Sequence, residues 1–228
     1  MNTARFLKSA GLGLGDEVIL SAYAGTETAQ SVAAVGARPV FVDIDPSSYC
    51  IDPEAIAAAL TSRTAAVVVA SVFGCPPDLA RISELGRARG LLIVGAGEVE
   101  DDPDGIAQRR SHAAFLTARL TGVRTPEAHE GHTYQRYVVR VPGNGRPDRD
   151  AFARALRGRG VACEVPVRTP VHRQPAFRGS LRLPETERAV DETLALPLRG
   201  SLRRREVQRM VSSCNALGGL LPTSLSGR

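Results

Sequence analysis

Lysine and tryptophan are the residues that this sequence most clearly lacks. Its 228 residues contain a single lysine, Lys8, and no tryptophan, so arginine carries almost all of the positive charge behind the net charge of +5. The basic residues are spread along the chain and form no block with aromatics, which make up only 4% of the sequence. A nucleic-acid-binding surface usually needs such a block. We therefore do not expect a nucleic acid as partner.

Paired cysteines and long apolar runs are also missing. The cysteines Cys50, Cys75, Cys163 and Cys214 are far apart and form no C-x-x-C pair, so their spacing indicates neither a zinc site nor a disulfide framework. No stretch approaches the roughly 20 apolar residues of a membrane span, and residues 1–8 lack the apolar core of a signal peptide. We expect a cytoplasmic protein that is neither secreted nor embedded in a membrane.

Residues 1–104 alternate short apolar runs with helical segments. This alternation is typical of βα units on a mostly parallel sheet. Asp52 followed by Pro53 predicts the start of one helix, because aspartate is a favoured N-cap and proline fits the first turn. The pattern predicts strands over residues 17–20, 38–43, 65–70 and 91–94, and helices over residues 26–35, 53–60 and 78–89.

The composition changes over residues 95–104, which combine two glycines with five acidic residues. Because histidine and a regular ligand spacing are missing, we interpret this stretch as a solvated junction and not as a metal site. Residues 105–217 predict a smaller α+β domain, and residues 218–228 a frayed tail. In this half the pattern predicts helices over residues 106–120, 149–157, 185–194 and 203–217, and strands over residues 134–141 and 161–167.

Two short motifs have simple structural interpretations. Gly11, Gly13 and Gly15 resemble a phosphate-binding loop, but a dinucleotide loop follows a strand and opens a helix, whereas here a helical stretch precedes the glycines. We interpret them as a helix stop with a tight turn. His129 and His132 have a spacing that could hold a metal, but nothing nearby completes a ligand set. No metal is expected.

His172 lies in the segment PVHRQPAF, where Pro170 and Pro175 restrict the backbone around the imidazole and the amide of Gln174. Such a segment could aim both polar groups at a ligand. The simpler interpretation is that His172 only forms hydrogen bonds with backbone carbonyls. Taken by itself, the segment favours this simpler interpretation.

Several segments together resemble one known family: GLGDEVIL, VGARPVFVDID, IDPEAIAAAL, FGCPPDL, YQRYVVRV, PVHRQPAF, LPETERA and LALPLRG. They are similar, in the family's own order, to the DegT/DnrJ/StrS nucleotide-sugar aminotransferases. The resemblance implies an α/β fold of the aspartate-aminotransferase type (fold type I), with a large cofactor domain, here partial, and a smaller α+β C-terminal domain. It implies a dimer that uses pyridoxal phosphate to move an amino group from an amino acid to a nucleotide-linked keto sugar, for antibiotics or polysaccharides.

The family's cofactor residues are missing at the matching positions. Gly25 stands where the family has the aromatic that stacks on the pyridine ring, and Gly95 and Ala96 stand at its Glu-Asp pair. The serine-lysine segment is absent, and the turn that grips the phosphate would precede residue 3. Lys8 lies on a helix that the family uses for packing, so we do not expect it to form the Schiff base. We expect no catalytic residues and no bound cofactor in this chain.

Some substrate-side or interface residues are retained. The resemblance implies such roles for Tyr23, Thr28, Gln30, Tyr134, Tyr137, His172 and Gln174. We therefore expect an internally deleted relative that is inactive alone, as a homodimer or with a partner. One alternative is a helper subunit that forms a heterodimer with a full-length aminotransferase. Another is a cofactor-free module that binds a nucleotide sugar.

Overall fold

The computed structural model describes residues 3–23, 25–96, 102–141, 148–198 and 202–218. The chain forms two compact units. The first unit comprises Met1–Glu100 and Thr169–Arg188, and the second comprises Asp101–Arg168 and Ala189–Arg228. The chain therefore leaves the first unit once and returns to it before finishing in the second.

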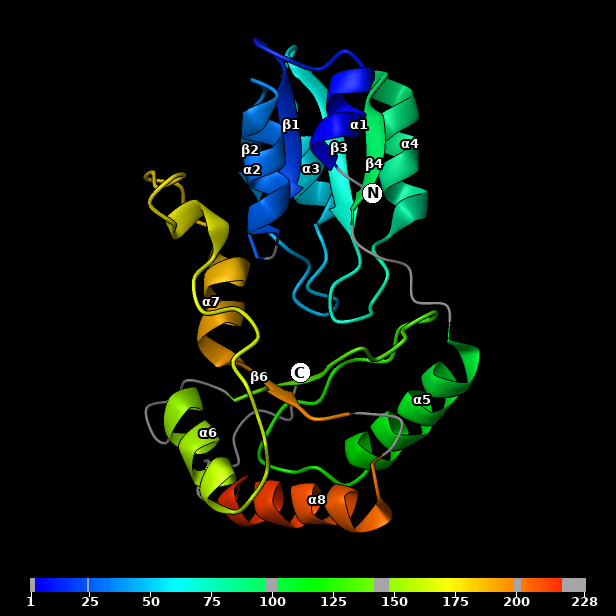
Figure 1. Ribbon diagram of the computed structural model, residues 1–228, viewed down its shortest axis with the longest axis vertical. Coiled ribbons are helices and arrows are strands. Elements are labelled where there is room, and N and C mark those ends of the chain that lie inside the picture. Colours follow the sequence, from blue (N-terminus) through cyan, green and yellow to red (C-terminus); the bar gives the residue numbers. More distant parts are fainter. Residues whose placement is uncertain (1–2, 24, 97–101, 142–147, 199–201, 219–228) are drawn as a thin grey trace. The chain divides into compact units, whose positions relative to one another are not determined.

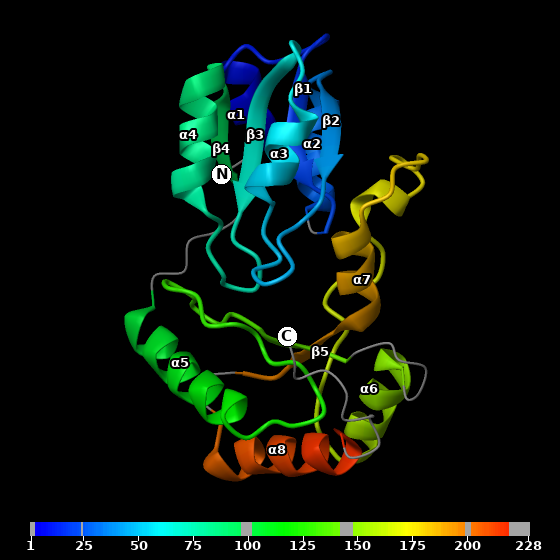
Figure 2. The ribbon, with the colours of Figure 1, turned by 180° about the vertical axis from the view of Figure 1, so that it is seen from behind.

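The first unit is built on a four-stranded parallel sheet with the strand order β2-β1-β3-β4 (Figure 1). The strands are β1 (Glu17–Ser21), β2 (Arg38–Val42), β3 (Thr64–Ala70) and β4 (Leu92–Ala96). Helices α1 (Thr3–Ser9) and α2 (Thr26–Ala34) pack on one face, and α3 (Pro53–Ala59) and α4 (Leu79–Arg89) pack on the other (Figure 2). The predicted βα organisation of this region is confirmed.

The strands are apolar on both faces because helices cover both faces. In β1, Val18 and Leu20 face the core on the side of α1 and α2, whereas Ile19 faces the core on the side of α3 and α4. All three side chains are buried. Burial of each contributes about 1.5–3 kcal/mol, so the central strand is held by two separate apolar layers.

Local sequence signals place the helix ends of this unit. The Asp52 side chain accepts a hydrogen bond from the Glu54 N–H (2.9 Å), which confirms the predicted N-cap of α3. Helix α1 ends at Ser9, and Gly11 (φ +83°) and Gly15 (φ +96°) then adopt left-handed backbone before β1 begins. The glycine-rich stretch is therefore a helix stop and turn, as predicted.

Residues 169–188 pack with the first unit, although the sequence pattern assigned them to a domain over residues 105–217. The Val171 N–H donates to the Ala22 carbonyl (2.8 Å), and Phe177 packs edge-on against Phe41 (5.5 Å between ring centroids). The segment contains the short 3₁₀ helix η1 (Val171–Arg173) and the start of α7 (Pro184–Glu192). These contacts join residues that are far apart in the sequence. The local pattern of apolar and polar residues therefore could not predict them.

The second unit has the expected α+β composition. Strands β5 (Tyr137–Arg140) and β6 (Thr193–Leu196) form an antiparallel pair in which Tyr137 faces Leu196. Its helices are α5 (Pro103–Thr117), α6 (Arg149–Gly158) and α8 (Arg204–Gly218), together with the end of α7. The core joins Phe152 and Leu156 of α6 to Tyr137 and to Met210 of α8.

Three predictions for the second half were wrong in part. The strand expected over residues 161–167 is reduced to one bridge between Glu164 and Ala195, in keeping with the interruption by Pro166. The helix expected over residues 185–194 stops at Glu192, because residues 193–196 pair with β5. The strand expected over residues 134–141 begins only at Tyr137, since Tyr134 adopts a positive φ of 49°.

The predicted junction over residues 95–104 is shorter than expected. Residues 95 and 96 are the end of β4, and α5 begins at Pro103 with Asp102 as its N-cap. The Asp102 side chain accepts a hydrogen bond from the Gly105 N–H (3.1 Å). Residues 97–101 and the predicted tail beyond residue 218 lie outside the described residues.

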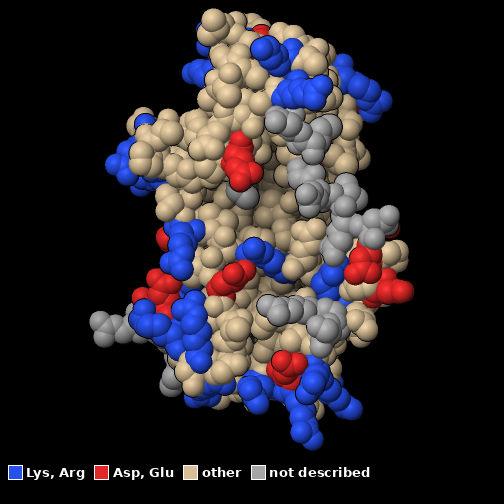
Figure 3. All heavy atoms as spheres, in the orientation of Figure 1, with Lys and Arg blue, Asp and Glu red and all other residues tan. Residues whose placement is uncertain are grey.

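Charge on the surface is mixed on the face that Figure 3 shows. Lysine and arginine side chains form several separate groups there, with acidic side chains between them. Among the described helices, none combines the length and the apolar character that crossing a bilayer requires.

A buried carboxylate joins three segments at the amino edge of the parallel sheet. Glu17, at the start of β1, is 1% exposed. Its carboxylate accepts hydrogen bonds from the Thr61 hydroxyl (2.6 Å), Arg63 Nε (2.9 Å) and an Arg38 guanidinium nitrogen (2.6 Å). These bonds, led by that from Thr61, lower the pKa of Glu17 to about 2. The charged form therefore holds β1, β2 and the segment before β3 together.

We expect the free energy of unfolding of Glu17→Gln to change less with pH in the acid range than that of the unchanged protein. A carboxyl whose folded pKa is depressed stabilises the fold fully above its unfolded pKa, about 4.5, and this contribution is lost as pH falls toward about 2. The unchanged protein should therefore lose stability over this window more steeply than Glu17→Gln. Urea unfolding at a series of pH values measures both profiles, with Glu84→Gln, on the exposed surface of α4, as the control. Parallel profiles for all three proteins would contradict the assignment.

Candidate functional site

The carboxyl edge of the parallel sheet is where α/β folds bind ligands. Strands β1, β3 and β4 end there at Ser21, Ala70 and Ala96. Four of the residues singled out in the sequence lie between the end of β1 and the middle of α2: Tyr23, Gly25, Thr28 and Gln30. Helix α2 begins in this stretch, so the fold brings these positions to one edge of the sheet.

Tyr23 is enclosed by other aromatic rings. It is fully buried, with Tyr49 stacked at 5.7 Å and Phe73 edge-on at 5.9 Å between ring centroids. Tyr49 (φ +62°) and Phe73 (φ +57°) hold left-handed backbone that bulky residues rarely adopt. The side chain of Tyr23 is therefore enclosed in an aromatic cluster, and no face of its ring is exposed.

Gly25 is the N-cap of α2 and has φ +101° and ψ 38°. A Cβ atom added there would lie 3.4 Å from the Thr28 hydroxyl oxygen, so Thr28 already occupies the nearest space. Thr28 is half-buried, and Gln30 lies on the exposed surface of α2. The start of α2 thus uses the conformational freedom of glycine, and an aromatic residue there would be strained.

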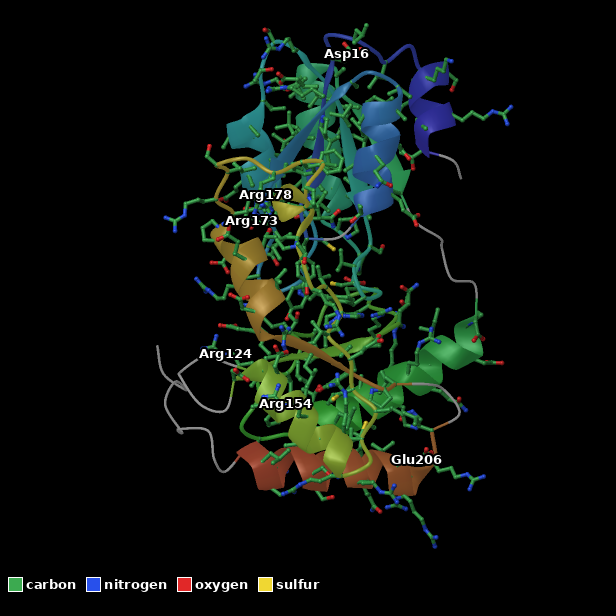
Figure 4. All side chains as sticks on the ribbon, turned by 60° about the vertical axis from the view of Figure 1, so that its left-hand side comes forward. Asp16, Arg124, Arg154, Arg173, Arg178 and Glu206 are labelled. Atoms are coloured by element: carbon green, nitrogen blue, oxygen red, sulfur yellow. The ribbon has the colours of Figure 1, made fainter. Side chains whose placement is uncertain are left out.

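His172 is held by charged neighbours within the first unit. It is 1% exposed, and its Nε2 lies 3.2 Å from the Glu187 carboxylate on α7. Arg173 also binds Glu187 and lies beside α7 (Figure 4). The hydrogen bond from Arg173, together with that shared with His172, lowers the pKa of Glu187 to about 2. Within the described residues, His172 Nδ1 is buried without a hydrogen-bond partner.

Gln174 connects the PVHRQPAF segment to α2. Its side-chain N–H donates to the Thr26 hydroxyl at 2.9 Å. With the bond from Val171 to Ala22, this contact fixes the segment beside the carboxyl end of β1. The structure therefore brings His172 and Gln174 close to the stretch that contains Tyr23 and Thr28, all within the first unit.

The remaining candidates lie in the second unit. Tyr134 stacks on His132 with 3.9 Å between ring centroids, and its N–H donates to His132 Nδ1 (2.9 Å). Burial, reinforced by the neighbouring His129, lowers the pKa of His132 to about 4. Tyr137 is buried and shares a hydrogen bond with the Thr117 hydroxyl (2.7 Å), while burial raises its pKa. Over the described part of the chain, no group of three or more histidine, cysteine or acidic residues could hold a metal.

These residues do not fit the pyridoxal phosphate that the resemblance implies. Gly25 presents no ring, and its backbone disfavours a residue that would. Ala96, which the resemblance aligns with the aspartate that pairs with the pyridine nitrogen, presents only a methyl group. Tyr23, the aromatic nearest in sequence, is packed against Tyr49. Lys8 is exposed on α1, and α1 precedes the amino end of β1, opposite the ligand-binding edge.

Sequence reasoning missed the residues that hold this edge together. Asp43 accepts hydrogen bonds from the N–H groups of Glu185 (2.9 Å) and Thr186 (2.7 Å) and so caps α7. A signal for it existed: Pro184 opens α7, but the preceding Leu183 cannot cap a helix, so a cap had to come from elsewhere. Tyr49 and Phe73 gave no local signal of their positive φ or of their contact with Tyr23.

Comparison with known proteins places this geometry among aminotransferases. The chain is 28% identical over 300 residues to the "Pleiotropic regulatory protein" of Geobacillus stearothermophilus, covering 90% of this chain and 79% of that protein. It is 39% identical over 190 residues to the L-glutamine:scyllo-inosose aminotransferase of Streptomyces griseus, covering 83% of this chain and 41% of that protein. The chain thus spans less than half the length of the latter relative.

The fold is shared with solved aminotransferases. The structure of the aminotransferase TlmJ from Streptoalloteichus hindustanus is similar with a TM-score of 0.85 and 26% identity, covering 97% of this chain and 84% of that one. A family model matches residues 4–96 and 103–215, which is most of the sequence. The protein accordingly belongs to the DegT/DnrJ/EryC1/StrS aminotransferase family.

Proposed function

We propose that this chain is a non-catalytic member of the sugar aminotransferase family, associated with amino-sugar formation but unable to transfer an amino group by itself. Members of this family depend on pyridoxal phosphate, which supplies the electron sink of the reaction when bound. The family also contains relatives named for amination of a cyclic keto-polyol and of a nucleotide-linked keto sugar. This chain retains much of the fold of such proteins but lacks the residues that the cofactor needs.

The observation that carries the proposal is the position of the only lysine in the sequence. A Schiff base requires a lysine amine at the cofactor. Lys8 lies on α1, which leads through a short turn to the amino end of β1. The five residues of β1 separate that end from the carboxyl edge by about 16 Å. Lys8 therefore lies at the wrong end of the sheet to serve a cofactor bound at the carboxyl edge.

The alignment with the Geobacillus protein supports an internal deletion. Its 300 aligned residues exceed the 228 residues of this chain, so a block within the relative has no counterpart here. The match to the family model breaks between residues 96 and 103, directly after β4. A loss at this point agrees with the absence of the expected serine-lysine segment.

Reduction with borohydride in the presence of pyridoxal phosphate tests the proposal. We expect peptide mass spectrometry to find no stoichiometric pyridoxyl adduct on the purified chain. The Streptomyces griseus aminotransferase, treated in parallel, serves as the positive control. Lys8→Arg keeps the charge of Lys8 and cannot form a Schiff base, so any signal it shares with the unchanged chain is non-specific. A stoichiometric adduct on Lys8 would contradict a non-catalytic role.

A further inference from the structure

The two edges of the parallel sheet in the first unit are protected to different degrees. Strand β2, at one edge, begins with the exposed Arg38 and with Pro39, which has no N–H to donate. Phe177 also covers β2 through its contact with Phe41 (5.5 Å between ring centroids). Charge, proline and a covering segment are features that prevent an edge strand from pairing with another chain.

Strand β4, at the other edge, lacks the charge and the proline that protect β2. Its sequence, LIVGA over Leu92–Ala96, contains no charged residue and no proline. In the part of the chain that the structure describes, no strand pairs with its outer side. The outer N–H and C=O groups of β4 therefore form an open template for another strand.

The side chains of β4 nevertheless make contacts on both faces of the sheet. Val94 is 1% exposed and belongs to the core beneath α1 and α2, while Ile93 packs against Gly86 of α4. Gly95 is exposed, and a Cβ atom added to it would meet nothing within 4 Å. These contacts hold the strand against its neighbours. Its outer backbone edge around Gly95 is the part that could pair with another strand.

We propose that β4 pairs antiparallel with β4 of a second copy of this chain, which joins two four-stranded sheets into one. A two-fold axis through such a pair places the same strand opposite itself. Centred on Val94, the pairing sets Leu92 opposite Ala96 and Ile93 opposite Gly95. Leu92 and Ile93 then each face a small residue, Val94 faces its own copy, and no like charges face each other.

A second copy is the occupant that best matches this edge. The match to the family model stops at residue 96, where β4 ends, and the aligned relative has an additional internal block. A block of that relative therefore has no counterpart in this chain, and the family match is interrupted directly after β4. A second copy of the chain has the same uncharged strand, and its β4 can run antiparallel to the first. This inference does not require the chain to be non-catalytic, and its readout, oligomeric state, is independent of any cofactor.

Substitutions at Gly95 test the pairing without disturbing the core. Gly95→Lys places a charge in the proposed interface, and Gly95→Val adds a residue that favours strands. We expect sedimentation equilibrium to find a dimer of the unchanged chain, with a dissociation constant raised about tenfold or more in Gly95→Lys and unchanged or lowered in Gly95→Val. Leu79→Lys, which replaces an exposed leucine of α4, is the charge control and should leave the dimer unaffected.

Hydrogen exchange supplies a second readout at the strand itself. Exchange of the amides over Leu92–Ala96 should slow as protein concentration rises, and this dependence should disappear in Gly95→Lys. Circular dichroism identifies any variant that fails to fold, and Gly95→Ala separates the loss of glycine from the gain of charge. A monomer at all concentrations would overturn the proposal. So would a dimer that Gly95→Lys leaves intact, or an edge occupied only by a full-length aminotransferase.

Discussion

Replacing Phe152 with alanine is expected to destabilise the second unit by about 3–5 kcal/mol, the usual cost of truncating a fully buried aromatic. Phe152 lies on α6 with no exposed surface, in a cluster with Tyr137 and Met210. Its loss would leave a cavity between α6, the β5–β6 pair and α8, because such a core relaxes only partly.

Hydrogen exchange followed through urea unfolding can localise this effect. The amides of β5 and α8 should lose protection in Phe152→Ala, whereas those of β1 and β3 should change little, since the two units have separate cores. Phe152→Leu keeps most of the volume and should cost about 1.5 kcal/mol or less. Equal losses in Phe152→Ala and Phe152→Leu would show that packing around α6 is less tight than the structure indicates.

The second large effect is expected at Asp43, the distant cap of α7. Asp43→Ala removes the acceptor of the Glu185 and Thr186 N–H groups and of the Thr186 hydroxyl (2.7 Å). Loss of an N-cap costs about 1–2 kcal/mol, and leaving the buried Thr186 hydroxyl without its partner adds about 1–3 kcal/mol. Hydrogen exchange of α7 and chemical unfolding measure these two consequences.

Asp43→Asn is the matched variant. Its amide oxygen can still accept from Thr186, whereas its NH₂ group cannot accept from Glu185, so we expect a smaller loss than in Asp43→Ala. Because α7 carries Glu187, which binds His172 and Arg173, increased exchange should extend to η1 in Asp43→Ala. If Asp43→Ala and Asp43→Asn lost the same stability and showed the same exchange in α7, the hydrogen bonds of Asp43 would not be what holds this segment.

The packing of Tyr23, His172 and Gln174 bears on the proposal that this chain does not catalyse amino transfer. Tyr23, His172 and Gln174 survive in the sequence, but the structure assigns each of them a partner within the first unit. They stabilise the carboxyl edge through contacts with Tyr49, Glu187 and Thr26. These contacts give each residue a structural role, and their role toward a sugar stays a prediction.

Local sequence determined the parallel half of this protein. Apolar runs of four to six residues, separated by amphipathic helices, were sufficient to predict β1 to β4 and the three helices between them. Asp52 and Pro53 predicted the start of α3, and Gly11 and Gly15 predicted the turn after α1. These features are decided within a few residues of the chain, through hydrogen bonds and steric limits that the local sequence specifies.

The tertiary structure alone decided the features that depend on partners distant in sequence. Residues 193–196 continue a helical pattern but form a strand, because β5 supplies backbone hydrogen bonds. Residues 169–188 join the first unit, because Ala22 and Asp43 bond to them across more than 140 residues. The sequence by itself thus determined the family and predicted the loss of cofactor residues, whereas packing determined which retained side chains are buried.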